Sequence, residues 1–209
     1  KLFYKQIKFF YVSPNLEFNE ENILIFKNTR FYSYSGNSWK SIVIDLTRNM
    51  KSIKKNLKDS LRRDIHRKNK KFTVKQSFFE DDFLVFKKNY IKEMKRKNFK
   101  GVNLKLIKNL FLSKNFLIFN AYKNNNIISS VGIVTHGKSA TYLVGLNLDS
   151  NQTANDLLLW KIMIFLKRRN FSKFDLGGID YEKNKNVSYF KSNFGGKEYN
   201  LVGSKFLIS

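Results

Sequence analysis

The sequence predicts an α/β (α+β) fold in which a mixed, mostly antiparallel sheet is flanked by helices. One observation is the run of three strands over residues 116–147, joined by the polar turns "KNNN" and "HGKS". The other is helical periodicity before and after that run, over residues 80–96, 103–113 and 153–169. Helices on both sides of a block of strands are typical of a sheet that is covered on both faces.

The N-terminal part is expected to add strands and one basic helix. The stretches "NILIFK" (22–27) and "SIVIDL" (41–46) have the pattern of short strands. From Thr47 onward the apolar residues recur at three- and four-residue spacing, which predicts a single amphipathic helix with Thr47 as its N-cap. The apolar stripe consists of Met50, Ile53, Leu57, Leu61 and Ile65.

Composition limits the classes of protein to consider. The chain has 209 residues, 42% of them apolar and 21 of them Phe, so it suits one domain with a substantial core. We divide the chain into two parts. Residues 1–69 hold the N-terminal strands and the basic helix, which are expected to pack on the core, and residues 70–209 form the main domain. The absence of cysteine excludes disulfides, thiolate metal sites and a cysteine nucleophile. His66 and His136 lie far apart and near no carboxylate cluster, so no metal is expected.

The net charge of +24 has two interpretations. It indicates a polyanionic partner such as tRNA, a nucleotide-linked sugar, coenzyme A or an anionic membrane face. Alternatively, it follows from AT-rich codon usage, because Lys outnumbers Arg 32 to 8 and proline appears once. The chain contains no run of about 18 apolar residues, so no transmembrane helix is predicted. The expected location is the cytoplasm, and peripheral attachment to the inner face of the membrane is compatible with it.

The order of elements from residue 72 is typical of a known fold. "FTVKQS" (72–77) is a strand, "KFDLGG" is a strand after the helix at 153–169, and "EYNLVGSKFLI" closes the domain. The resulting string is β-α-α-β-β-β-α-β, then a short helix and a last strand. It resembles the order of the Gcn5-related N-acetyltransferase (GNAT) fold.

Five spaced motifs narrow this resemblance. Residues 41–203 resemble the C-terminal part of the Fem family of peptidoglycan-bridge aminoacyltransferases and their FemAB-like relatives. The double arginine of the basic helix and four motifs after it carry the similarity: Arg62-Arg63, Tyr142 with Gly145, Leu158-Leu159-Trp160, Asp175 to Gly178, and Phe190-Lys191 through Gly195-Gly196. On this basis residues 70–209 are expected to be a GNAT-like, Fem-type acyltransferase domain.

The resemblance implies N-acyl transfer to an amine of a cell-envelope precursor: an amino sugar nucleotide, peptidoglycan or a surface glycan. No permanently bound cofactor is expected. The donor is acyl-CoA, an acyl carrier protein or aminoacyl-tRNA. The family members that use aminoacyl-tRNA usually have two tandem GNAT-type domains and about twice this length, which favours a thioester donor. The segment "DSNQTAND" replaces the usual pyrophosphate-binding loop, which favours aminoacyl-tRNA. Backbone amides at the start of the helix at 153–169 remain able to receive a phosphate.

The C-terminal motif supplies the first candidate residues. The resemblance implies that Lys191 points into the site beside the reacting carbonyl or a donor phosphate, where its ammonium is a fixed positive charge. Phe190 is expected to contact the substrate next to it. Asp175 either accepts the amine proton or caps the turn at Gly177 and Gly178, the other edge of the site. The alternative for Lys191 is an ordinary solvated lysine.

Other candidates come from the neighbouring segments. The Tyr142 hydroxyl is expected to bind the acceptor, unless the ring is only part of the core. Asp180 and Tyr181 are substrate-binding candidates on the loop after the strand. Arg62 and Arg63 suit bidentate contact with the diphosphate of a nucleotide- or lipid-linked acceptor, or else belong to a solvated basic face.

Two other hypotheses remain open from the sequence. One is a non-catalytic basic module that binds RNA or the membrane surface on a GNAT scaffold. The other is a half-enzyme whose cleft is completed by a partner or by a homodimer.

Overall fold

A computed structural model describes residues 9–12, 16–29, 31–33, 39–149 and 151–208. Its centre is a seven-stranded sheet that is antiparallel throughout except for one pair, β7 and β8. In spatial order the strands are β4 (Thr73–Ser77), β5 (Phe116–Lys123), β6 (Asn126–His136), β7 (Ser139–Asn147), β8 (Lys173–Ile179), β3 (Lys40–Asp45) and β9 (Lys197–Asn200). The mixed, mostly antiparallel GNAT-like sheet predicted from the sequence is therefore confirmed.

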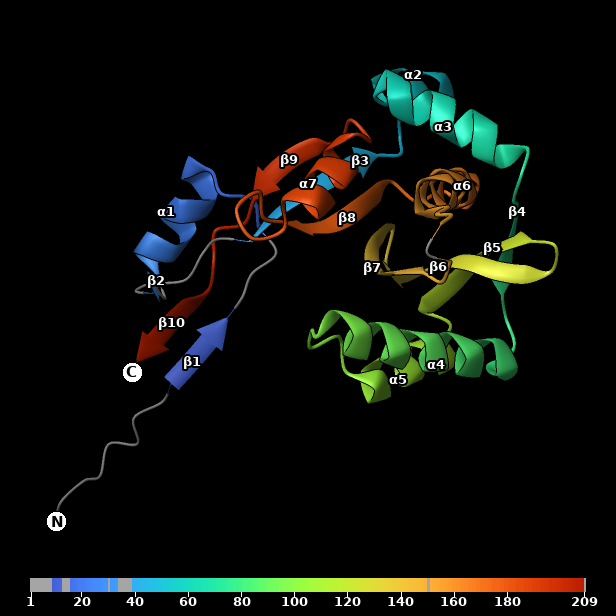
Figure 1. The fold of residues 1–209 in the computed structure, drawn as a ribbon. Coiled ribbons are helices and arrows are strands. Elements are labelled where there is room, and N and C mark those ends of the chain that lie inside the picture. The colour runs from blue at the N-terminus through green and yellow to red at the C-terminus, as the bar shows by residue number, and fades with distance from the viewer. Residues whose placement is uncertain (1–8, 13–15, 30, 34–38, 150, 209) are drawn as a thin grey trace, which may run out of the picture.

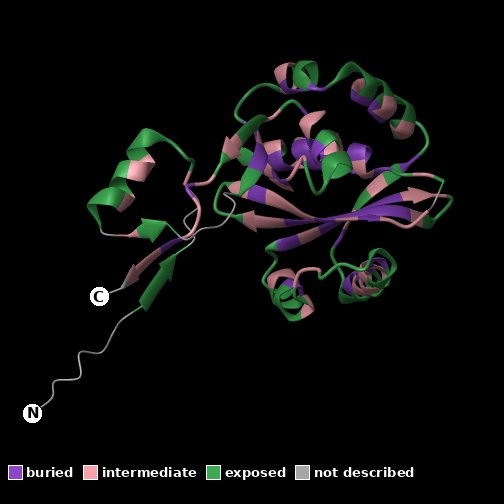
Figure 2. Ribbon diagram, turned by 60° about the vertical axis from the view of Figure 1, so that its left-hand side comes forward, coloured by how far each residue is buried: buried purple, intermediate pink, exposed green. Residues whose placement is uncertain are grey.

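Helices cover both faces of this sheet, as Figure 2 shows. One layer contains α2 (Met50–Asn56), α3 (Asp59–Asn69), α6 (Asn155–Arg168) and α7 (Lys185–Ser192). The other contains α4 (Glu80–Lys97) and α5 (Leu104–Leu112). The larger core lies under α6, where residues such as Leu158 and Ile162 are fully buried, and a smaller core lies under α4 and α5. Burial of these apolar faces is the main stabilising contribution to the domain.

A small three-stranded sheet joins the two ends of the chain. It has the order β1 (Phe9–Val12), β10 (Lys205–Ile208) and β2 (Tyr32–Ser33), and α1 (Glu20–Asn28) lies beside it (Figure 1). The prediction of a strand at 22–27 is wrong, since these residues belong to α1. Asn19 caps this helix by accepting a hydrogen bond from the amide of Asn22, and two glutamates occupy its first turn.

The predicted single basic helix is two helices, α2 and α3. Asn49, and not Thr47, is the N-cap of α2, because its side chain accepts a hydrogen bond from the amide of Ser52 at 2.7 Å. Leu57 and Lys58 have extended backbone torsions (ψ 143° and 142°). The amide of Lys58 donates to the carbonyl of Asn193 at 2.9 Å, so a contact with α7 replaces a helical hydrogen bond. The apolar stripe remains directed at the core on both helices.

The parallel pair β7 and β8 is short, and this creates an opening in the sheet. The strands pair only between Ser139–Thr141 and Lys173–Asp175. Beyond that point β7 continues beside β6 and β8 continues beside β3. Helix α6 connects them, and a site is expected where parallel strands separate next to such a helix. Strand β3 comes from the segment 1–69 and lies within the main sheet; the division of domains at residue 69 stays a prediction.

Candidate active site

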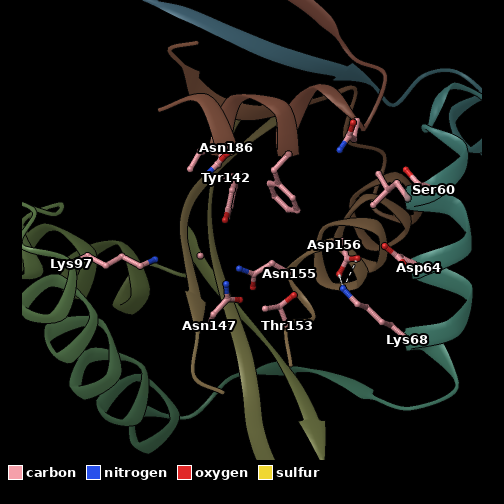
Figure 3. Close-up of a pocket in the computed structure, with 15 residues that line it drawn as sticks. Ser60, Asp64, Lys68, Lys97, Tyr142, Asn147, Thr153, Asn155, Asp156 and Asn186 are labelled. Carbon is pink, nitrogen blue, oxygen red and sulfur yellow. Dashed lines mark hydrogen bonds and ion pairs between the residues drawn. The ribbon is translucent and has the colours of Figure 1, made fainter. Parts of the chain in front are cut away.

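A cavity of about 400 Å³ lies at the opening between β7 and β8 (Figure 3). Its walls come from β7, the start of α6, α3, α7 and the last residue of α4. Most of the residues that line it carry a polar side chain, and the charged ones among them are of both signs. The lining residues are Ser60, Leu61, Asp64, Lys68, Lys97, Tyr142, Gly145, Asn147, Thr153, Asn155, Asp156, Asn186, Val187, Phe190 and Asn193.

Tyr142 reaches this cavity because residue 145 is glycine. The hydroxyl of Tyr142 lies over Gly145, so a Cβ atom at position 145 would collide with it. The ring is half-buried against the main core, and burial raises the pKa of Tyr142 to about 12. The phenol therefore stays protonated at physiological pH and is able to donate a hydrogen bond. This gives the Tyr-x-x-Gly spacing a physical reason.

Asn155 stands at the start of α6 and faces the same space. Figure 3 shows its carboxamide directed toward Tyr142 and Asn147. Its Nδ2 atom would lie 3.3 Å from a Cβ atom at Gly145. Its Oδ1 atom is buried without a hydrogen-bond partner in the part of the chain that the structure describes. An unpaired buried polar atom is uncommon in folded proteins and costs stability, so this residue is a functional candidate.

An ion pair between α3 and α6 closes another side of the cavity. The Nζ atom of Lys68 lies 2.9 Å and 2.8 Å from the two carboxylate oxygens of Asp156, which is 6% exposed. Asp156 also accepts a hydrogen bond from the amide of Leu157 at 2.9 Å. The positive end of α6 therefore already faces a carboxylate from the protein itself. The partial positive charge of the helix start is thus already compensated within the protein, which weakens the expectation of a phosphate there.

Lys191 is buried on α7, behind the wall of the cavity. It is 7% exposed, and its Nζ atom donates to the carbonyl oxygen of Gly178 at 2.7 Å. The same atom lies 5.7 Å from the centre of the Tyr142 ring. Burial lowers the pKa of Lys191 to about 8, although the charge of Asp175 acts in the opposite direction. Phe190, its neighbour, lines the cavity directly, whereas Lys191 does not.

Asp175 holds the turn at the end of β8. Its Oδ1 atom accepts hydrogen bonds from the amide of Gly177 at 2.7 Å and from the hydroxyl of Ser41. Its Oδ2 atom accepts one from the hydroxyl of Tyr199 at 2.7 Å. Burial, and then the Asp175 carboxylate, raise the pKa of Tyr199. Gly177 has a φ of +76°, a conformation that suits glycine, so the carboxylate supports a turn of unusual shape.

The hydrogen bond between Lys191 and Gly178 therefore joins the two predicted edges of the site, which are the turn at Gly177 and Gly178 and the segment Phe190-Lys191. Asp175, however, points away from the cavity. The side chains before and after it on β8, Phe174 and Leu176, belong to the core under α6, and alternation directs Asp175 to the other face of the sheet. It lines a second cavity there, of about 460 Å³, together with Tyr199 and Lys197.

Comparison with solved structures identifies the architecture. FemX superposes with a TM-score of 0.81 at 12% sequence identity, over 96% of this chain and 72% of the FemX chain. The fold is that of FemX. No protein-family model and no curated protein sequence matches the chain.

Two further structures share the FemX-like fold. The C-terminal domain of a putative lysylphosphatidylglycerol synthetase from Agrobacterium fabrum gives a TM-score of 0.67 at 15% identity, covering 92% of this chain and 66% of that chain. L-PGS from Bacillus licheniformis gives 0.59 at 14% identity, with the same coverages of 92% and 66%. This chain thus spans about two thirds to three quarters of the structures it resembles. The likeness establishes the fold that this chain shares with FemX and with these two structures.

The loop after β8 in the FemX-like fold carries Asp180 and Tyr181, and neither lines the cavity. Asp180 accepts hydrogen bonds from the amides of Lys183 and Glu182, which lower its pKa. The hydroxyl of Tyr181 donates to Glu198, and this bond raises the pKa of Tyr181. In this structure both side chains bind neighbouring protein groups, and their substrate contacts stay a prediction.

Arg62 and Arg63 also lie outside the cavity lining. The guanidinium of Arg62 donates to the carbonyl of Lys55 at 2.8 Å and pairs with Asp59. The Arg62 side chain therefore supplies a hydrogen-bond donor to the last carbonyl groups of α2, which lack partners within the helix. Arg63 is exposed on α3. Contact of these arginines with a diphosphate stays a prediction.

The sequence did not indicate the pair Lys68–Asp156 or the carboxamide of Asn155. Only the polar segment "DSNQTAND" at the start of α6 pointed to this region. Within the described ranges no group of three potential metal ligands occurs, and no helix there is long and apolar enough to cross a membrane.

Proposed function

We propose that the protein is an acyltransferase that forms an amide, by moving an acyl or aminoacyl group from an activated donor to an amine. The observation that carries this proposal is the polar cavity at the point where β7 and β8 separate, in a fold shared with FemX. Neutral hydrogen-bonding groups line it, and they suit the carbonyl, amine and hydroxyl groups of such substrates.

The donor follows from the electrostatics of the helix start. Asp156 occupies the positive end of α6 and Lys68 is already paired with it, so neither the helix start nor this lysine is free to bind a coenzyme A pyrophosphate. We therefore favour aminoacyl-tRNA, whose phosphates lie along the nucleic acid and outside a pocket of this size. Acyl-CoA and an acyl carrier protein are the competing donors.

The acceptor is the amine of a cell-envelope precursor, which is an amino sugar nucleotide, a peptidoglycan stem or a surface glycan. This part rests on the resemblance of the motifs around Lys191 to the Fem family. The name of the putative lysylphosphatidylglycerol synthetase structure supports a lysyl or similar aminoacyl group as the cargo.

Lys191 supplies the positive charge in this proposal. Acyl transfer builds negative charge on the carbonyl oxygen, and a nearby ammonium stabilises it in a site that excludes water. With a pKa of about 8, Lys191 is mostly charged at pH 7. Its hydrogen bond to Gly178 fixes the ammonium behind the Tyr142 ring.

Mass spectrometry of the reaction products tests the function. The purified protein is incubated with acetyl-CoA, an acyl carrier protein thioester or aminoacyl-tRNA, each with amino sugar nucleotides and muropeptides as acceptors. The expected result is an acceptor whose mass rises by one acyl or aminoacyl group with one donor class. Absence of any product with all three donors would contradict the proposal.

A second candidate function is a non-catalytic module that binds RNA or an anionic membrane surface. The specific observation is a row of exposed basic residues on α2 and α3, which includes Lys51, Lys54, Lys55, Lys58 and Arg63. Binding that is insensitive to sequence and falls steeply with salt, without any product in the mass spectra, would favour it. Gel filtration of the same purified protein would test the hypothesis that a homodimer completes the cleft.

A further inference from the structure

Two neutral hydrogen-bond donors from different elements face one point of the cavity. The hydroxyl of Tyr142 comes from β7 and the Nδ2 atom of Asn155 from α6. Both lie next to the position that a Cβ atom at Gly145 would occupy, the hydroxyl in collision with it and Nδ2 at 3.3 Å. Figure 3 shows both side chains directed into the same space.

The Tyr142 ring packs against the core, but the polar ends of both side chains are left unused by the described residues. Within the part of the chain that is described, neither the Tyr142 hydroxyl nor the Asn155 carboxamide has a hydrogen-bond partner, and the Oδ1 atom of Asn155 is buried without one. Folded proteins pair nearly all such groups, because leaving them unpaired costs stability. Of these atoms only Oδ1 of Asn155 is both buried and unpaired in the described residues, and because it is an acceptor it indicates a ligand that supplies an N–H group there, such as the attacking amine, beside the two donors.

The chemistry of the pair selects the ligand atom. Tyr142, with a pKa of about 12, and the amide of Asn155 remain neutral donors over the physiological pH range. The adjacent charges of Lys68 and Asp156 cancel each other. Two neutral donors that converge on one point suit an oxygen with two lone pairs, which is a carbonyl oxygen.

We propose that Asn155 is a catalytic residue that, with Tyr142, binds the carbonyl oxygen of the acyl group being transferred. This inference rests on the proposed acyl transfer. The amine nitrogen forms the new C–N bond while the carbonyl π pair moves onto the oxygen, where both donors hold the oxyanion. The pair then returns, the bond to the leaving sulfur or oxygen breaks, and the proton lost by the amine ends on that leaving atom. Donors directed at such an oxyanion stabilise it without reorganisation.

Asn155→Leu is the decisive substitution, since Leu has a similar volume and no donor. The expected kcat falls by roughly 100-fold with little change in KM, because the contact strengthens in the transition state. The melting temperature is expected to stay equal or rise, because an unpaired buried carboxamide is removed. Asn109→Leu is the matched control, since Asn109 is exposed on α5, remote from the cavity.

A spectroscopic measurement tests the contact without turnover. The probes are acetonyl-coenzyme A and a 3′-aminoacylamino-3′-deoxyadenosine, each labelled with ¹³C at the carbonyl and bound to the full chain. The infrared carbonyl stretch of one probe is expected to move to lower frequency in the wild type. That shift should diminish in Asn155→Leu and in Tyr142→Phe, and persist in Asn109→Leu.

The outcomes separate this inference from the function. A wild type that forms product, with Asn155→Leu equally active or with an unchanged carbonyl shift, overturns the role of Asn155 alone. A wild type that shifts neither probe overturns it as well. Absence of product with every donor counts against the acyl transfer itself, whatever the infrared result.

Discussion

The Nζ atom of Lys191 lies 2.7 Å from the carbonyl oxygen of Gly178, so a buried lysine connects α7 to the end of β8. This hydrogen bond joins the two parts of the C-terminal motif, thirteen residues apart along the chain. It also places a cation behind Tyr142, whose hydroxyl reaches the cavity. The effects of substituting Lys191 are therefore expected to concern both the reaction and the pH dependence of stability.

Lys191→Met is expected to lower kcat/KM by roughly 100-fold, because the buried positive charge is lost while the length of the side chain is kept. Steady-state rates with the donor that the wild type accepts would measure this. Lys185→Met, on an exposed position of the same helix, serves as the control and should remain fully active. Equal rates for the two variants would remove Lys191 from the mechanism.

The contribution of Lys191 to the stability of the wild type is expected to rise between pH 8 and 10.5. The pKa of Lys191 is about 8 in the folded protein, against an ordinary value of 10.5, so within this window the unfolded chain binds the additional proton. Burying the charged form is costly below pH 8, and this cost disappears as the pH rises. The gain over the window is roughly 2–3 kcal/mol.

Urea unfolding of the wild type and of Lys191→Met at several pH values isolates this contribution, since every other titrating group is common to both proteins. The difference in the free energy of unfolding should change across pH 8–10.5 and be constant below it. A constant difference over the whole range would show that the Lys191 pKa is not depressed.

Gly145→Ala is expected to reduce activity because the new Cβ atom displaces the hydroxyl of Tyr142. A loss of roughly 100-fold in kcat is expected, as for removal of a single donor to the oxyanion. In a Tyr142→Phe background the same substitution should cost clearly less, because that hydroxyl is already absent. Additive effects in this double-mutant cycle would contradict the contact between the two positions.

Lys68→Met is expected to destabilise the fold by roughly 2–4 kcal/mol, because it leaves the buried carboxylate of Asp156 without its counter-charge. The double substitution Lys68→Met/Asp156→Leu should recover most of that loss, since a well-packed apolar pair replaces a buried ion pair at little cost. Chemical denaturation of the two single variants and the double variant provides the measurement. A double variant that is less stable than Lys68→Met would refute a simple charge-pairing role.

Local patterns account for most of the predicted elements. Strands β5, β6 and β7 follow from short apolar runs between turn-forming residues, and α4, α5 and α6 follow from helical periodicity. The spacing of Tyr142 and Gly145 pointed to a wall of the cavity, and a β-bulge at Leu143 places these two positions on the same side of β7.

Predictions failed where contacts distant in sequence decide the backbone. Residues 22–27 have the composition of a strand but form α1, whose start is fixed by the cap at Asn19. The stripe from Met50 to Ile65 has unbroken helical spacing, yet the carbonyl of Asn193 takes the amide of Lys58 and divides the helix. A periodic pattern records which face is buried and does not record such a hydrogen bond.

The sequence by itself determined the order of the elements, their apolar faces and the motif around Lys191, because each depends on residues within one or two turns of each other. Only the tertiary structure decided that Asp175 points away from the cavity, that Asn155 stands opposite Tyr142, and that Lys68 neutralises Asp156 from 88 positions away. These relationships depend on how β7, β8 and α3 are placed in space. Packing of the whole domain fixes that placement, and no local pattern encodes it.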